Sequence, residues 1–275
     1  MDTRYKTLSS QSAEVLKHFT DLNQSGFTLG EASRLLQKSS PDAVKKLMRD
    51  MIKRGLLMRV KEGTYWIIPY EEEAVPYFPN PHLIVRYLAG RADYYIGYYS
   101  ALEVHSLITQ PAMVEQIVVS KQIKPAEIKI KGHRFRFIYH NQLHFFGTKK
   151  IWIDNQNKAI CSDLEKTFID CLFKPDYGGG ISEIAKAIFK SKDKLDYERL
   201  FDYCRRFKAQ SVIKRLGFLM DTLNIKNPIT DKLQAMKTPS NILLEPTYEN
   251  QGPFISRWSI RRNIELSDIT SSIYT

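Results

Sequence analysis

Apolar residues recur at helical spacing in three stretches of the first 70 residues. In the first stretch, residues 12–22, these are Val15, Leu16 and Phe19. The second begins at Thr28, a good N-cap whose capping-box partner is Glu31, three residues later. The third begins at Ser40 and Pro41, an N-cap followed by a residue suited to the first helical position. Each stretch is therefore predicted to form a helix.

The third helix is basic and leads into a hairpin signal. Its apolar stripe consists of Val44, Leu47, Met48 and Met51. Gly55 can adopt the left-handed conformation that ends a helix. Two β-rich runs, residues 56–60 and 64–68, follow and are joined by Lys61-Glu62-Gly63. Two helices, a turn, a basic helix and a hairpin occur in the order of a winged helix-turn-helix.

In a winged helix-turn-helix the third helix enters the major groove of DNA, where cations reach phosphates and N-terminal residues reach base edges. The candidate DNA-binding residues are Ser39, Ser40, Asp42, Lys45, Lys46, Arg49 and Lys53, with Arg59 and Lys61 on the wing. The alternative interpretation is an amphipathic helix whose charged side is merely solvated. The order of cap, turn, charge and wing favours DNA binding.

A composition break separates this region from the rest of the chain. The run PYEEEAVPYFPNP, residues 69–81, contains four prolines and three consecutive glutamates, which favours an irregular connector. We therefore expect a winged helix-turn-helix domain at residues 1–70, a linker at 71–81 and a larger domain at 82–275.

The larger domain shows strand patterns first and helix patterns later, so the fold class is predicted to be α+β. Helices are expected at residues 82–88, 100–107, 181–189, 197–207 and 211–223, and from a Ser162–Glu165 capping box to about Phe173. Strands are expected at residues 115–120, 127–131, 133–139, 144–153 and 241–244. The tail beyond Arg262 is expected to be frayed.

Composition and charge narrow the functional classes. The 275-residue chain carries a formal net charge of +11, spread over both regions, so nucleic acid is a plausible partner for either. No signal peptide and no membrane-spanning run are expected. The three cysteines are far apart, which is typical of free thiols in a reducing cytoplasm. No metal site and no cofactor are predicted.

The hairpin at residues 127–139 is a candidate second nucleic-acid surface. Its cations alternate with apolar residues, which places them on one face of a strand pair: Lys129, Lys131, Arg134 and Arg136. A solvated outer face over a packed inner face is the alternative, and it is the one we favour. If the face does bind phosphates, it would take promoter DNA or RNA.

Other polar residues are assigned structural roles. His105 is expected to be packed or capping, because Glu103 and His105 face different ways on a helix. Lys166 is expected to pair with Asp163 and Asp170 on one helix, which contributes a few tenths of a kcal/mol per pair and needs no catalysis. Residues 178–180, three glycines before a helix, are read as a sharp turn in preference to an anion-binding nest.

Two further motifs, together with the winged helix, resemble the AbiEi family of type IV toxin–antitoxin (abortive infection) antitoxins. They are YYIGYYSALEVHSL, residues 94–107, and SDLEKTFIDCLFKPDYGGGISEIAKAI, residues 162–188. The resemblance covers roughly residues 10–225; the last fifty residues match nothing we can name.

The resemblance implies a two-domain antitoxin that is not an enzyme. Its winged helix would repress its own operon by binding inverted repeats in promoter DNA. Its C-terminal domain would neutralise a nucleotidyltransferase-like toxin without a stable complex, in the cytoplasm and in defence against phage. Two other functions stay open. One is a winged-helix transcription factor with a ligand-sensing domain, and the other is an enzyme acting on nucleic acid.

Overall fold

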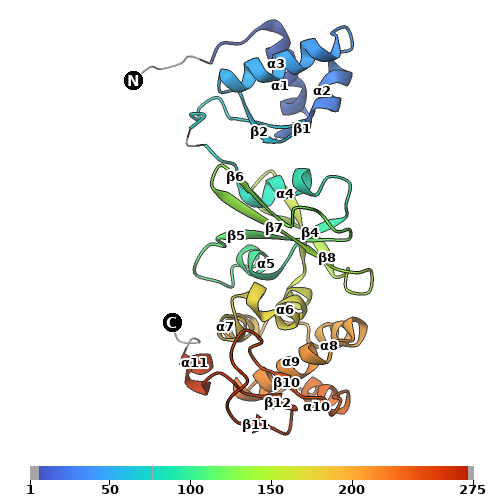
Figure 1. The fold of residues 1–275 in the computed structure, drawn as a ribbon, viewed down its shortest axis with the longest axis vertical. Helices are drawn as coiled ribbons and strands as arrows, with labels where there is room; N and C mark the ends of the chain where they lie inside the picture. The colour runs from blue at the N-terminus through green and yellow to red at the C-terminus, as the bar shows by residue number, and fades with distance from the viewer. Residues whose placement is uncertain (1–5, 76, 272–275) are drawn as a thin grey trace. The chain divides into compact units, whose positions relative to one another are not determined.

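In the computed structural model, which describes residues 6–75 and 77–271, the chain divides into two compact units. The first unit comprises the chain up to Arg91 with two short segments, 130–132 and 152–158; the second comprises the remainder. The elements form a mixed α+β fold, as the sequence predicts (Figure 1).

The first unit contains the predicted winged helix-turn-helix. Its helices are α1 (Ser10–Asp21), α2 (Leu29–Leu35) and α3 (Pro41–Lys53), and its hairpin is β2 (Leu57–Lys61) with β3 (Thr64–Ile67). The capping box of Thr28 with Glu31 and the N-cap Ser40 are confirmed. Gly55 and Gly63 both have positive φ, as their turns require. The apolar faces of α1, α2 and α3 meet in one core that includes Val15, Phe19 and Met48.

Two elements extend this unit beyond the prediction. A three-residue strand, β1 (Gly26–Thr28), pairs with β3 and gives the sheet order β1-β3-β2. Helix α4 (Pro81–Ala89) contacts β1 and β2, so it belongs to the first unit, whereas the sequence placed it in the second domain. The segment expected to be a linker also packs on this unit, because Trp66 donates to the hydroxyl of Tyr77 at 3.3 Å.

The second unit is built on a six-stranded mixed sheet in the order β6-β7-β5-β4-β9-β8. The strands are β4 (Tyr94–Ile96), β5 (Val114–Val119), β6 (Glu127–Ile130), β7 (His133–Tyr139), β8 (Thr148–Trp152) and β9 (Lys158–Ser162). Strand β5 runs antiparallel to β4 and parallel to β7. The single strand expected at 144–153 is wrong in its first half, where the chain forms a loop before β8.

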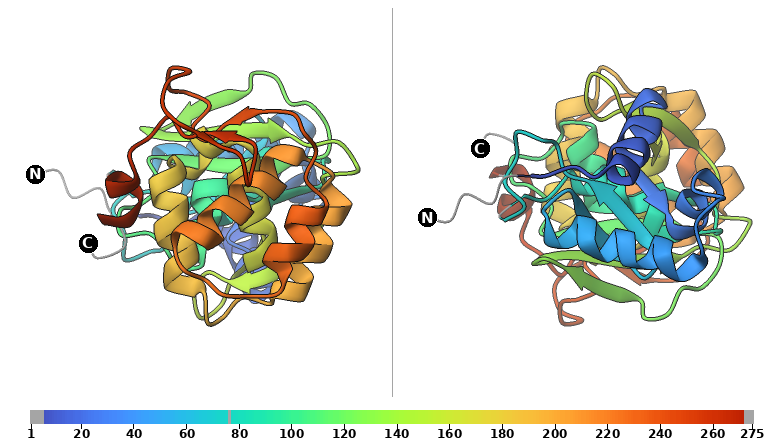
Figure 2. Two further views of the ribbon diagram at one scale, coloured as in Figure 1. Left: turned by 90° about the horizontal axis from the view of Figure 1, so that it is seen from below. Right: turned by 90° about the horizontal axis from the view of Figure 1, so that it is seen from above.

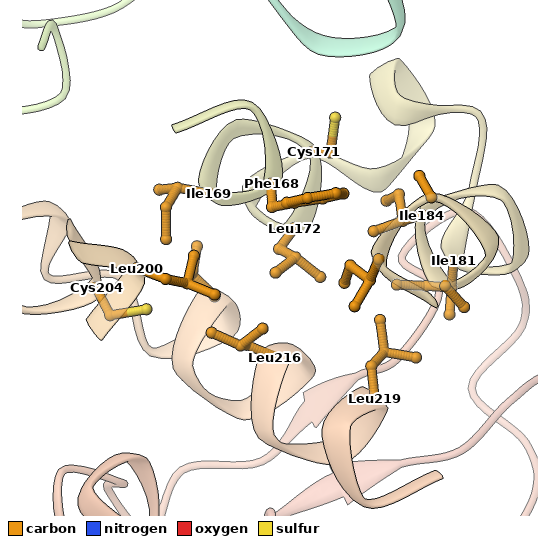
Figure 3. Close-up of a cluster of buried hydrophobic side chains, with 14 of the residues drawn as sticks. Phe168, Ile169, Cys171, Leu172, Ile181, Ile184, Leu200, Cys204, Leu216 and Leu219 are labelled. Carbon is orange, nitrogen blue, oxygen red and sulfur yellow. The ribbon is translucent and has the colours of Figure 1, made fainter. Parts of the chain in front are cut away.

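Helices pack on this sheet in successive layers. Helix α5 (Tyr98–Val104) contacts both β5 and α6 (Leu164–Phe173). The 3-10 turn η1 (Pro175–Gly178) and three helices follow: α7 (Ile181–Ser191), α8 (Tyr197–Phe207) and α9 (Gln210–Thr222). Figure 3 shows their shared core, in which Phe168 and Leu172 of α6 face Leu216 and Leu219 of α9.

The C-terminal segment completes this core. It contains α10 (Ile229–Ala235), the short strands β10 (Ile242–Leu243), β11 (Phe254–Ile255) and β12 (Ile260–Arg261), and α11 (Leu266–Ser271). In the left view of Figure 2 this segment (red) lies across the helices, and α11 contacts α7. Ile269 is fully buried, so the expectation of a frayed tail beyond Arg262 is wrong as far as Ser271. Residues 272–275 lie outside the described residues.

Candidate nucleic-acid interface and buried polar network

Helix α3 presents a cationic face to solvent. Lys45, Lys46, Arg49 and Lys53 are all exposed, whereas Val44, Met48 and Met51 on the opposite side are buried. The apolar stripe therefore fixes the orientation of the helix, and the cations follow on the other face. Among the described residues, ion pairing on this face is limited to Lys45 with Asp42, at 3.7 Å. The cations on α3 thus have little intramolecular compensation.

The turn before α3 is held by side-chain hydrogen bonds. Ser40 accepts from the amide of Ala43 at 3.3 Å, and Gln11 of α1 donates to the hydroxyl of Ser39 at 3.2 Å. These bonds set the entry angle of α3. Ser39 is half-buried, while Ser40 and Asp42 are exposed at the helix N-terminus.

The wing differs from the surface that the sequence suggested. Lys61 is half-buried, and its ammonium donates to the carbonyl of Leu88 in α4 at 3.2 Å. Burial lowers the pKa of Lys61. Arg59 remains exposed on β2. Of the two wing cations, Arg59 therefore has no hydrogen-bond or ion-pair partner among the residues that the structure describes. Lys61 instead stabilises the end of α4, where a cation meets the helix dipole favourably.

Tyr87 fastens α4 to the sheet of the first unit. Its hydroxyl donates to the carbonyl of Gly26 at 2.7 Å, and its ring meets Trp66 edge to face at 5.8 Å. A Cβ at Gly26 would lie 2.6 Å from the Tyr87 ring, so this approach requires glycine.

We expect Tyr87→Ala to weaken the first unit by about 2 kcal/mol, because it removes a hydrogen bond and a packed ring. In hydrogen exchange on the full chain, the amides of β1 and β3 should exchange about 30-fold faster. Arg91→Ala, an exposed change just beyond α4, is the matched control. Unchanged protection in Tyr87→Ala would show that α4 does not support the sheet.

The hairpin β6–β7 does not present four free cations. Arg136 donates to the Glu127 carboxylate through Nε and Nη2, at 3.0 and 2.9 Å, and Arg134 lies 3.8 Å from the same carboxylate. Lys131 sits in the turn with positive φ and donates to the carbonyl of Ala74. Lys129 is exposed without a partner among the residues described. These contacts favour the solvated-face interpretation over a second phosphate-binding surface.

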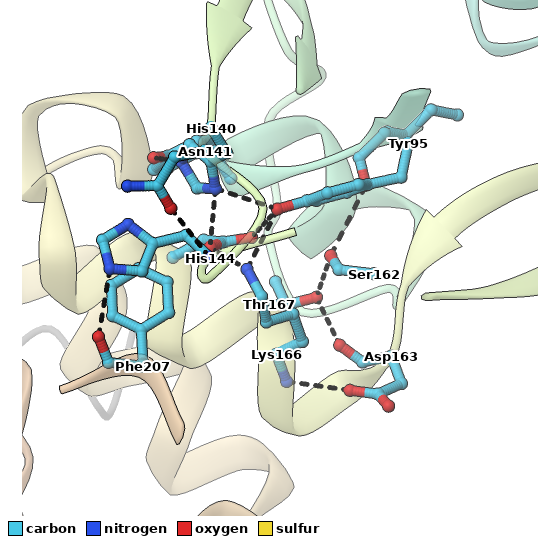
Figure 4. A network of polar contacts seen from close by, with 12 residues as sticks. Tyr95, His140, Asn141, His144, Ser162, Asp163, Lys166, Thr167 and Phe207 are labelled. Carbon is cyan, nitrogen blue, oxygen red and sulfur yellow. Dashed lines mark hydrogen bonds and ion pairs between the residues drawn. The ribbon is translucent and has the colours of Figure 1, made fainter. Parts of the chain in front are cut away.

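A polar network lies buried beneath the sheet of the second unit (Figure 4). Lys166 and Asp170 of α6 form an ion pair with both side chains fully buried. Tyr95 of β4 accepts from Lys166 at 2.9 Å and donates to Asp170 at 2.9 Å. The hydroxyl of Tyr98 lies 2.7 Å from Nε2 of His140, and that of Tyr95 lies 3.2 Å from Nδ1. Strand, loop and helix are thus joined through one set of polar atoms.

Burial controls the charges in this network. It raises the pKa of Asp170, opposed by the neighbouring Lys166, and it lowers the pKa of Lys166, opposed by Asp170. The pKa of His140 is lowered to about 2, first by burial and then by the positive charge of Lys166. His140 is therefore neutral and takes part through its two ring nitrogens. Because Lys166, Asp170 and His140 are shielded from solvent, the network is suited to holding β4, the loop at His140 and α6 together.

Two sequence interpretations of α6 need correction. The helix is capped by Asp163, which accepts from the amide of Lys166 at 2.8 Å, and not by Ser162. The hydroxyl of Ser162 instead lies 2.7 Å from that of Thr167. Glu165 does not close a capping box either, because it accepts from the amide of Asp196. The expected Lys166–Asp170 pair is present, with both side chains fully buried. Asp163 contacts the backbone amide of Lys166, and no ion pair between these two side chains is found among the described residues.

Two other structural assignments are confirmed. His105 is the C-cap residue of α5, and its Nε2 lies 2.9 Å from the carbonyl of Ser162. Gly179 and Gly180 have φ of 84° and 88° and form the sharp turn before α7. The buried carboxylate of Glu245 accepts from the amide of Ile181 at 2.9 Å, so the start of α7 already holds an internal anion.

An open pocket of about 560 Å³ lies in the second unit, beside this glycine turn. Its lining includes Tyr99, Met113, Arg136, Tyr177 and Glu183. It mixes aromatic and charged side chains, unlike the enclosed apolar cavity that a sensor of apolar ligands would need. Within the described ranges, no His, Cys, Asp and Glu residues cluster in a way that could hold a metal ion. No helix in the same ranges is both long and apolar enough to span a membrane.

Sequence reasoning missed His140 and the tyrosines that hold it. Tyr95 and Tyr98 stand in the motif at residues 94–107, but nothing in their spacing points to a histidine more than forty residues later. The only usable signal was the presence of hydroxyl-bearing side chains at strand and helix positions that are otherwise apolar.

No protein-family model and no curated protein matches this chain. Among solved structures, the crystal structure of the Rv2827c protein from Mycobacterium tuberculosis is similar to it, with a TM-score of 0.71 and 13% sequence identity. The match covers 98% of this chain and 96% of that one. Similarity at this identity establishes that the two chains share a fold.

Proposed function

We propose that this chain is a type IV antitoxin whose first unit binds promoter DNA and represses its own operon. The observation that carries the DNA-binding part is the exposed cationic face of α3, set at the correct place in a winged helix-turn-helix. Phosphate neutralisation by such cations supplies most of the affinity of a DNA-binding module. The inverted repeats expected in the operator follow from the family resemblance.

The antitoxin part of the proposal rests on the resemblance of residues 94–107 and 162–188 to the AbiEi family. The first of these segments supplies Tyr95 and Tyr98 and the second supplies Lys166 and Asp170, so both contribute to one buried network. The proposed partner is a nucleotidyltransferase-like toxin, countered in the cytoplasm without a stable complex and without catalysis by this chain. Co-expression with such a toxin tests this part alone: growth must be restored when the full chain is present.

The DNA-binding part is tested with Lys45→Ala, Lys46→Ala and Arg49→Ala combined in the full chain. We expect the variant to bind its promoter at least about 100-fold more weakly at low salt, because three phosphate contacts are lost. The slope of log affinity against log salt, measured by anisotropy between about 50 and 200 mM, should fall by about 2 to 3 units.

The matched control removes three exposed lysines of the second unit, Lys121, Lys124 and Lys226. It changes net charge by the same amount and should keep most of the affinity. Equal losses in the two variants would mean that net charge, and not α3, drives binding. An unchanged affinity and slope in the α3 variant would refute the proposed interface.

A further inference from the structure

The open pocket beside the glycine turn holds charged side chains that lack partners. Lys186 and Glu183 of α7 are half-buried in its lining, and Asp176 of η1 is exposed there. None of these three side chains forms a hydrogen bond or an ion pair within the part of the chain that the structure describes. The pocket is thus charged without the internal pairing that would make those charges structural.

Gln116 of β5 and Arg136 of β7 add two hydrogen-bond donors to the same pocket. The two residues are partners in the parallel ladder, so their side chains leave the same face of the sheet. Gln116 is 6% exposed, and its Oε1 accepts from the amide of Tyr99 at 2.8 Å, which leaves its Nε2 without an acceptor among the described residues. Arg136 uses Nε and Nη2 on Glu127, which leaves Nη1. Neighbouring donors of this kind suit the two oxygens of a carboxylate.

The pocket also offers apolar surface and a balanced charge. Met113 of its lining is 82% exposed, and Tyr99 and Tyr177 contribute two aromatic rings. Its volume of about 560 Å³ lies in the range of small-molecule sites. The two acids and two cations of the lining cancel, which disfavours a polyanion such as a nucleotide and a metal cation alike. A zwitterion with an apolar side chain fits all of these features.

We propose that this pocket binds a free α-amino acid with an aromatic or large apolar side chain. Gln116 and Arg136 donate to its carboxylate. Glu183, together with Asp176, accepts from its ammonium group, and its side chain covers Met113. The inference goes beyond the proposed function, because it depends neither on DNA binding nor on the antitoxin role.

Isothermal titration calorimetry on the full chain tests the proposal with L-phenylalanine and two derivatives. N-acetyl-L-phenylalanine lacks the ammonium group, and L-phenylalanine amide lacks the carboxylate. We expect each derivative to bind at least about 10-fold more weakly than L-phenylalanine, because each loses charge-assisted hydrogen bonds. AMP, a polyanion with an aromatic base, should not bind.

Two variants assign the groups of the ligand to their partners. Gln116→Glu keeps the acceptor for the amide of Tyr99 but replaces the free donor with a negative oxygen. It should weaken the binding of L-phenylalanine at least about 10-fold and leave L-phenylalanine amide at least as well bound as before. Glu183→Gln should show the converse pattern: the binding of L-phenylalanine weakens by a similar factor, and that of the acetylated derivative does not.

Gln122→Glu and Asp193→Asn, exposed changes in the same unit, are the matched controls and should leave all affinities unaltered. The proposal is overturned if L-phenylalanine gives no heat up to about 10 mM. It is also overturned if AMP binds in its place, or if Gln116→Glu, with a native circular dichroism spectrum, weakens the binding of the acid and the amide alike. Should that variant not fold, the converse pattern in Glu183→Gln decides alone.

Discussion

Lys166→Ala should destabilise the second unit by about 3 to 5 kcal/mol, the cost of leaving one member of a buried ion pair without its partner. Asp170 would stay fully buried with Tyr95 as its remaining donor. Because whole domains are stable by only about 5 to 15 kcal/mol, this loss is a large fraction of the total stability. Urea unfolding followed by circular dichroism measures the change.

Two further variants distinguish the loss of the buried ion pair from the general effect of removing a lysine side chain. Lys186→Ala removes a half-buried lysine of α7 that makes no ion pair with the described residues, and it should cost under about 1 kcal/mol. The double variant Lys166→Met, Asp170→Leu should recover much of the lost stability, because an apolar pair of similar size removes the unpaired charge. If Lys166→Ala is as stable as the unchanged protein, the Lys166–Asp170 pair contributes nothing to stability.

Acidification should destabilise the second unit through His140. The unfolded chain protonates this histidine below about pH 6.5, while the folded chain does so only near pH 2. The folded state therefore loses stability as pH falls below 6.5, by up to about 1.4 kcal/mol per pH unit. At pH 4.5 the loss from this one group would be about 2.7 kcal/mol, and stability at pH 7 and above would be unaffected.

His140→Gln tests this through the slope of stability against pH. The variant should be less stable at pH 7, because one of the two hydrogen bonds between the ring of His140 and the hydroxyls of Tyr95 and Tyr98 weakens. Its slope between pH 6.5 and 4.5 should nevertheless be shallower. Some slope should remain, since burial also lowers the pKa of His105 and of His144. His18→Gln, an exposed change on α1 of the first unit, is the control for the loss of an imidazole. Identical slopes in the unchanged protein and His140→Gln would contradict the prediction.

The sequence was most informative where structure is determined locally. The caps Thr28 and Ser40, the turn glycines and the apolar stripe of α3 act within a few residues of one another, and each was predicted correctly. Strand β1 was missed because its three residues become a strand only by pairing with β3. For the same reason α4 was placed in the wrong unit: the bond from Tyr87 to Gly26 spans 61 residues and leaves no periodic signal.

In the candidate sites, too, features that depend on neighbouring residues were predictable and features that depend on distant residues were not. The exposed face of α3 follows from its own periodicity, so all four of its cations could be named. Helical spacing predicts that Lys166 and Asp170 pair, but it does not predict that the pair is fully buried. The prediction that Lys61 faces DNA fails for a related reason. The sequence shows the charge of Lys61, but it does not show that its ammonium donates to the carbonyl of Leu88.

The position of Arg215 has a consequence for the order in which the protein forms on the ribosome. This buried guanidinium donates to the carbonyls of Leu172, Leu243 and Leu244, and so ties α6 to the C-terminal segment. Gly217, two residues later on α9, leaves room for the Trp258 ring, which a Cβ there would meet at 2.1 Å. These contacts of the second unit form only after residue 258 has been synthesised. At about 5 to 20 residues per second, α1 to α4 emerge roughly 10 to 40 seconds earlier. During translation, a nascent chain would therefore expose the proposed DNA-binding module before the rest of the molecule is complete.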